Sequence, residues 1–190
     1  MINKLTLEKN ILKKLDSSDK NERMSILSQL TQIENEKIIE KIISLLDDDD
    51  IMIRGEVFST LVLNKNDIST KLIHNLNSKS KNIKAFCSLI LANRNDKNGI
   101  SSISKLTDDP SGMVRSCAFG SLGHLKASNV RQKIHQGIFD PNIEVKKSAA
   151  HALTLINEKF SNEEKIELEK QNDGDFKKIL KWWTGRDLNP

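Results

Sequence analysis

A basic residue recurs along this sequence at the almost constant spacing of 31, 30, 31 and 31 residues. These positions, which we call the cation ladder, are Arg23, Arg54, Lys84, Arg115 and Lys146. A row of cations could bind phosphate groups or an acidic peptide through charge-assisted hydrogen bonds. A strictly periodic charge is also what the stacking of repeats would select, and we favour this interpretation. Each cation would then pair with an Asp in the turn of its own or the neighbouring unit, where the sequence offers Asp16, Asp47, Asp108, Asp109 and Asp140.

A second group of cations lies in residues 79–133, which hold ten Lys and Arg residues against three Asp. Such a stretch could contact nucleic-acid phosphates, and binding would then weaken steeply with salt. We favour an ordinary solvated surface, because these cations fall in predicted helices and turns alike and neither Tyr nor Trp lies among them to stack on bases. The candidate partner-binding residues in this stretch are Lys79, Lys81, Arg94, Arg131 and Lys133.

Residues suited to catalysis or metal binding show none of the required spacings. No His stands four residues from another His beside a Glu, and neither Cys87 nor Cys117 has a second Cys two to four residues away. The sequence also lacks a glycine-rich phosphate loop and a recognisable catalytic triad. We therefore predict no catalytic residues, no metal site and no cofactor, in a protein that is not an enzyme.

Two helices per unit account for the apolar pattern around the cation ladder. In the second unit, Ile and Leu residues at helical spacing predict a first helix over 38–46 and a second over 53–61. The turns between helices are rich in Asp, Asn, Ser and Pro, which favour turns and cap helix starts. Short helix pairs cannot bury both apolar faces alone, so the stacking of like units predicts a superhelical array.

The fourth and fifth units share a sharper motif. An Asp-bearing turn is followed by Val114-Arg115 or Val145-Lys146, and then by small residues within 116–123 or 148–152. This pattern resembles the second helix of HEAT-like repeats, and the period of about 31 is similar to that of the short HEAT-like class of phycobilisome lyases. The resemblance covers roughly residues 4–157 and implies an all-α, armadillo/HEAT-like α-α superhelix. It implies little about function, because such repeats serve many unrelated partners.

The expected organisation is about five two-helix repeats over residues 4–157, followed by C-terminal capping helices over 158–181 and a disordered tail over 182–190. Ser161 and Glu164 are spaced as a capping box. No apolar run approaches the roughly 20 residues that span a bilayer, and the N-terminus lacks the features of a secretory signal. We therefore expect a cytoplasmic protein that does not bind membranes, with its two Cys reduced.

Three functions are open at this point. We favour a non-catalytic scaffold that mediates protein–protein interaction. The second is a nucleic-acid-binding module that uses residues 79–133, and the third, implied only by the resemblance, is a relative of the bilin-attaching lyases. Cations of 79–133 gathered on one face would favour nucleic acid. A neutral surface with exposed apolar groups would instead favour an as yet unidentified protein partner.

Overall fold

The computed structural model describes residues 4–170 and residue 174. The described residues form α-helices, short 3-10 helices and turns, without strands. Their contacts divide the chain into two compact units, Met1–Arg94 and Asn95–Pro190, and each is described by itself. No helix in the described part of the chain is both long and apolar enough to cross a membrane.

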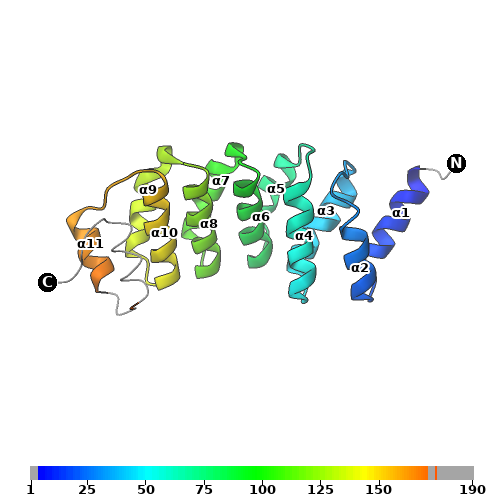
Figure 1. The fold of residues 1–190 in the computed structure, drawn as a ribbon, viewed down its shortest axis with the longest axis horizontal. Coiled ribbons are helices and arrows are strands. Elements are labelled where there is room, and N and C mark those ends of the chain that lie inside the picture. Colours follow the sequence, from blue (N-terminus) through cyan, green and yellow to red (C-terminus); the bar gives the residue numbers. More distant parts are fainter. Residues whose placement is uncertain (1–3, 171–173, 175–190) are drawn as a thin grey trace. The chain divides into compact units, whose positions relative to one another are not determined.

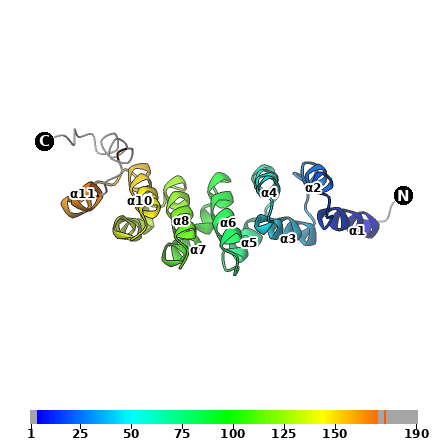
Figure 2. The same ribbon diagram turned by 90° about the horizontal axis from the view of Figure 1, so that it is seen from below.

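Three helix pairs make up the first unit. Their bounds are α1 (Lys4–Leu15) with α2 (Lys20–Leu27), α3 (Glu36–Ser44) with α4 (Ile51–Leu63), and α5 (Ser69–Asn75) with α6 (Lys81–Asn93). The second helix of the middle pair, α4, packs between α2 and α6 (Figure 1). The second helices therefore lie in one layer, and the first helices lie in the other (Figure 2).

Local sequence explains where these helices begin. The side chain of Asp50 accepts a hydrogen bond from the Met52 N–H at the start of α4, and Ser80 caps α6 in the same way through the Ile83 N–H. The apolar face predicted for the first helix of the second repeat is confirmed, because Ile42, Ile43 and the other Ile and Leu residues of 38–46 are buried. Caps and apolar spacing together place the helices as the sequence predicts.

Two further helix pairs and a terminal helix make up the second unit. They are α7 (Ile100–Lys105) with α8 (Gly112–His124), α9 (Arg131–Gln136) with α10 (Ile143–Leu155), and α11 (Asn162–Glu169). The first helices are short, and 3-10 turns over Leu106–Asp108 and Gly137–Phe139 extend them. The capping box predicted at the start of α11 is present, with Ser161 and Glu164 bonded reciprocally.

Small residues allow α8 and α10 to pack at close range. A Cβ atom added to Gly123 would lie 2.6 Å from the Cα atom of Ala152. One added to Gly137 would lie 2.5 Å from the ring of Phe119 and 2.7 Å from Ala149. Only glycine fits at these two contacts, because real Cβ atoms essentially never lie within 3.0 Å of other heavy atoms.

The fold confirms the prediction of an all-α solenoid of five two-helix repeats. The capping segment predicted over 158–181 is described as far as Lys170, where it contains α11. The rest of that segment, apart from Gly174, and the tail predicted to be disordered over 182–190 lie outside the described residues.

Candidate functional site

The arginines of the cation ladder each close the turn that precedes their own helix. The Nη1 atom of Arg23 donates to the carbonyl oxygen of Ser17 at 2.7 Å. Arg54 donates to that of Asp48 at 2.6 Å, and Arg115 donates to that of Asp109 at 2.9 Å. In every case the acceptor lies six residues earlier. The periodic spacing of the arginines thus matches a periodic structural contact.

Three ladder cations also reach carboxylates of the segment that follows their own repeat. Arg115 holds Asp140 in a bidentate pair, with Nε–Oδ2 at 2.7 Å and Nη2–Oδ1 at 2.9 Å. Arg23 lies 3.5 Å from Asp48 in a looser pair, and the buried Lys146 pairs with Glu167 of α11. Burial opposes ionisation of the Asp140 carboxyl, but the hydrogen bonds from Arg115 and from the Asn142 N–H outweigh it and lower its pKa.

The structure corrects the choice of acidic partners. We expected Asp16, Asp47 and Asp108 among the acceptors, but Asp16 pairs with Lys41 and Asp108 with Lys133, while Asp47 accepts from Asn82 at 2.8 Å. Asp140, which was among the expected acceptors, does meet Arg115, whereas Arg23 meets Asp48, one position after the expected Asp47. Both carboxylates lie six residues before the next ladder cation. Lys84 lies near the start of α6 and is half-buried.

A hydrogen bond within the turn fixes the position of each such carboxylate. The side-chain oxygen six residues before the ladder cation accepts the N–H two residues further on. This contact recurs for Ser17, Asp48, Ser78, Asp109 and Asp140, at 2.8–3.2 Å. Its near-constant spacing in the sequence is the signal that could have identified the partners. The same spacing shows that the third repeat differs from the others that follow an arginine. Ser78 lies at the position where an Asp would be needed to pair with Arg54.

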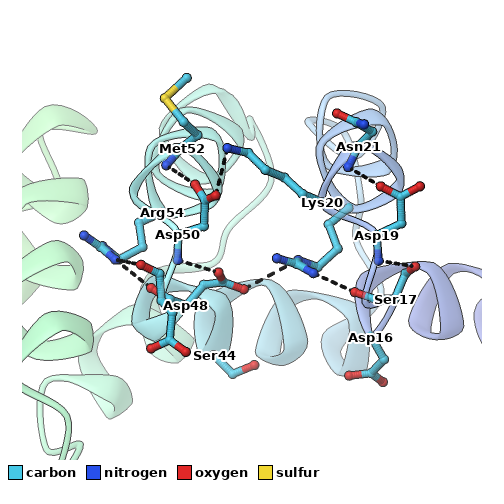
Figure 3. A network of polar contacts seen from close by, with 12 residues as sticks. Asp16, Ser17, Asp19, Lys20, Asn21, Ser44, Asp48, Asp50, Met52 and Arg54 are labelled. Atoms are coloured by element: carbon cyan, nitrogen blue, oxygen red, sulfur yellow. Dashed lines mark hydrogen bonds and ion pairs between the residues drawn. The ribbon is translucent and has the colours of Figure 1, made fainter.

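Arg54 is consequently held by its own turn alone. Its Nη1 atom donates to the carbonyl oxygens of Asp48 and Asp49, and it forms no ion pair with the described residues. Figure 3 shows Arg54 bonded only to the backbone of its own turn, whereas Arg23 also reaches the Asp48 carboxylate. We call this incomplete position the open rung.

The candidate partner-binding cations differ in the contacts that they make within the chain. Arg94 donates to the carbonyl oxygens of Leu61, Asn64 and Asn66, so it clamps the end of α4 and the turn after it. This use of Arg94 differs from the partner contact that we expected. Lys133 pairs with Asp108, and Arg131 lies 3.7 Å from Glu158.

Lys79 and Lys81 differ from these three residues. Both are exposed, and their side chains form no hydrogen bond or ion pair with the described residues. Both also lie at the start of α6, beside the open rung.

Neither cysteine has the environment of a nucleophile. Both are free thiols. Burial, with a smaller contribution from the charge of Glu40, raises the pKa of Cys87 to about 12, and burial also raises the pKa of Cys117. Thiolate chemistry needs the opposite shift. Among the described residues, no group of three or more His, Cys, Asp or Glu side chains could hold a metal ion.

We expect Cys87 to resist alkylation in the native protein, because it is buried and its thiol stays protonated at neutral pH. Iodoacetamide treatment followed by peptide mass spectrometry should label Cys87 only after unfolding in urea. Cys117 is half-buried and should react at an intermediate rate. Rapid native labelling of Cys87 would contradict the burial described here.

The exposed positions of α4 are all uncharged. They are Ile51, Met52, Gly55, Ser59 and Leu63, and the last four are spaced by three or four residues on one side of the helix, with the half-buried Glu56 beside them. Met52 is 57% exposed and Leu63 is 60% exposed. The matching positions are Asn21 and Met24 in α2 with its C-cap Ser28, and Asn82, Leu89 and Asn93 in α6, of which Met24, Asn82 and Leu89 are half-buried. We call this set the neutral face.

Gly55 is the unusual member of the neutral face. A Cβ atom added there would meet nothing within 4 Å, so packing within the described chain does not require glycine. Glycine inside a helix costs about 0.5–1 kcal/mol relative to alanine. The missing side chain leaves the centre of the neutral face open, so that another molecule could approach the backbone of α4 closely.

No protein-family model matches the sequence, and no curated relative was found. Solved structures do match. A chain in the complex of CpcE and CpcF of phycocyanin lyase from Nostoc sp. PCC7120 is 18% identical, with a TM-score of 0.58 over 90% of this chain and 73% of that one. Two designed armadillo repeat proteins are also 18% identical, with TM-scores of 0.54 and 0.53 over 93% of this chain and 98% and 97% of theirs. The second of these is in complex with the peptide (KR)4.

This chain has a HEAT-like repeat fold. The three matches share the helical repeat architecture, and at 18% identity they show the fold alone. Within this HEAT-like array, the cation ladder is part of the stacking contacts. The open rung and the neutral face are the two features that the stacking leaves unused.

Proposed function

We propose that this HEAT-like chain is a non-catalytic scaffold that binds another protein through the neutral face of α2, α4 and α6. The observation that carries the proposal is the exposure of Met52 and Leu63 on α4, whose exposed positions are all uncharged. Cores of protein interfaces are depleted in charge and enriched in residues such as Met. Completing the burial of each side chain would contribute about 1–2 kcal/mol to binding.

A nucleic-acid partner fits these residues less well. Phosphate binding needs cations free to replace counterions, but Arg94, Arg131 and Lys133 already have partners within the chain. Two structural neighbours are a protein complex and a peptide complex, which supports a polypeptide partner for this fold. No residue described here favours bilin-lyase activity, so that activity is not part of the proposal. A cytoplasmic location, consistent with free thiols, belongs to it.

Gly55→Glu tests the proposal directly. The new side chain would add charge at the centre of the neutral face without a clash, since nothing lies within 4 Å of the added Cβ atom. With the immobilised chain, a partner would be captured from a lysate, identified by mass spectrometry and purified. We expect Gly55→Glu to weaken its binding at least about tenfold, because an uncompensated charge would be desolvated.

Gly55→Ala is the matched control, since it makes the same backbone change without the charge. It should keep most of the affinity and raise Tm slightly. Equal binding by wild type and Gly55→Glu would contradict the proposed surface. Capture of nucleic acid alone, released by moderate salt, would contradict a protein partner.

A further inference from the structure

The open rung combines a fixed guanidinium with a missing carboxylate. Arg54 makes the same backbone bond as Arg23 and Arg115, so its side chain is anchored as theirs are. Its Nε and Nη2 atoms have no partner among the described residues. Ser78 occupies the turn position that supplies Asp48 and Asp140 elsewhere, and its Oγ atom accepts the Ser80 N–H at 3.2 Å as those carboxylates accept theirs.

The acids of the preceding turn do not neutralise Arg54 through their side chains. The carboxylate of Asp48 faces Arg23, and that of Asp50 pairs with Lys20 at 2.8 Å (Figure 3). The carboxylate of Asp47 accepts from Asn82. Only the carbonyl groups of Asp48 and Asp49 reach Arg54. The Nε and Nη2 groups of Arg54 therefore remain available as donors, and no carboxylate of the described residues pairs with its positive charge.

The other ladder cations of this chain show which chemical group such a position binds. Arg115 takes a carboxylate in the bidentate geometry that suits a guanidinium, and the ladder cations Arg23 and Lys146 also meet carboxylates. We propose that Arg54 is a binding site for an Asp or Glu side chain of the protein partner, whose carboxylate takes the place of the missing turn acid. This inference rests on the proposed function and names the chemistry of the partner.

Neighbouring residues favour the same occupant. Lys79 and Lys81 flank the turn, exposed and without partners among the described residues, and they add positive charge within screening distance of Ser78. Met52, an exposed member of the neutral face, lies two residues before Arg54 on α4, and the two side chains leave the helix on different sides. A partner that contacts both would have to extend around the N-terminal end of α4.

Ser78→Asp would fill the rung from within the chain. By analogy with Asp48 and Asp140, the new carboxylate should pair with Arg54 and raise Tm by about 2–4 °C, while partner affinity falls about tenfold. Ser17→Asp is the matched control. Ser17 takes the same turn position, but no ladder cation precedes it in the described chain, so neither quantity should change. A lower Tm for Ser78→Asp, or unchanged affinity, would overturn the proposal.

Carboxylate binding can be measured without any partner. In ¹H–¹⁵N spectra of the full chain, added sodium acetate should shift the Arg54 Nε–H resonance and leave those of Arg23 and Arg115 in place. Sodium chloride at equal ionic strength should not produce the shift, and Ser78→Asp should abolish it. An equal shift in chloride, or a shift in phosphate but not in acetate, would overturn the carboxylate assignment.

The two proposals can fail separately. If a captured partner is lost on Gly55→Glu but binds Ser78→Asp normally, the inference about the open rung is wrong and the neutral face stands. If acetate shifts Arg54 but no protein partner is captured, the rung binds carboxylate and the assignment to a protein partner is wrong.

Discussion

Gly123→Ala is expected to destabilise the protein by about 1–3 kcal/mol, although alanine is the better helix former. The added methyl group would lie 2.6 Å from the Cα atom of Ala152 and 2.8 Å from its Cβ atom. Backbone cannot yield as a flexible side chain does, so α8 and α10 would have to separate. Urea unfolding followed by circular dichroism at 222 nm measures the change.

Gly120→Ala in the same helix provides the control. A Cβ atom at Gly120 would meet nothing within 4 Å, so this substitution should raise stability by about 0.5–1 kcal/mol. The two variants share a helix and a chemical change, and they differ only in what the methyl group meets. Similar effects at both positions would show that α8 and α10 do not pack at the distance described.

Asp140→Ala is expected to cost about 2 kcal/mol, because it leaves Arg115 half-buried without its carboxylate. The Arg115 and Asp140 side chains are 15% and 10% exposed, so water screens the pair only in part. Asp108→Ala is the control, since its carboxylate is 69% exposed and a surface pair contributes about 0–1 kcal/mol. Equal costs for the two variants would contradict a stronger pair at Asp140.

The stabilisation by Asp140 should depend on pH in a defined direction. Its pKa is lower in the folded protein than the ordinary value of 3.8, so the unfolded chain takes up a proton first as pH falls. The contribution is therefore complete above about pH 5 and is lost as pH falls through the folded pKa. The difference between wild type and Asp140→Ala should be constant from pH 7 to about 5 and shrink below about 4.

The helices could be predicted because their apolar residues recur at the same positions in each repeat. The partners of the charged residues could not, because they depend on the backbone conformation of the turns. Ile42 and Ile43 are buried because helical spacing assigns them to one face. The choice between Asp47 and Asp48 as the partner of Arg23 rests on a one-residue difference in a turn. Arg94 was beyond sequence reasoning for another reason, since it binds backbone carbonyls about 30 residues earlier. Carbonyl groups carry no residue type that a sequence pattern could reveal.

The neutral face could be predicted only as a kind of surface. Apolar residues surround α4 on nearly every side, including Met52, Val57 and Leu63. Periodicity therefore does not say which of them face solvent. The packing of α4 between α2 and α6 decides it, burying Val57 and leaving Met52 and Leu63 exposed. The absence of a turn acid at Ser78 is visible in the sequence once the acceptor position is known.

The second, fourth and fifth repeats each carry the two halves of a joint: a ladder cation and, six residues earlier, an Asp at the position that pairs with the cation of the preceding repeat in Arg23–Asp48 and Arg115–Asp140. A tandem duplication of about 31 residues, wherever it begins, copies both halves together. The new copy would meet matching partners on both sides without a further mutation. An array built on such joints can lengthen or shorten by whole units during evolution, and a lost acid, as at Ser78, leaves a joint that another molecule can complete.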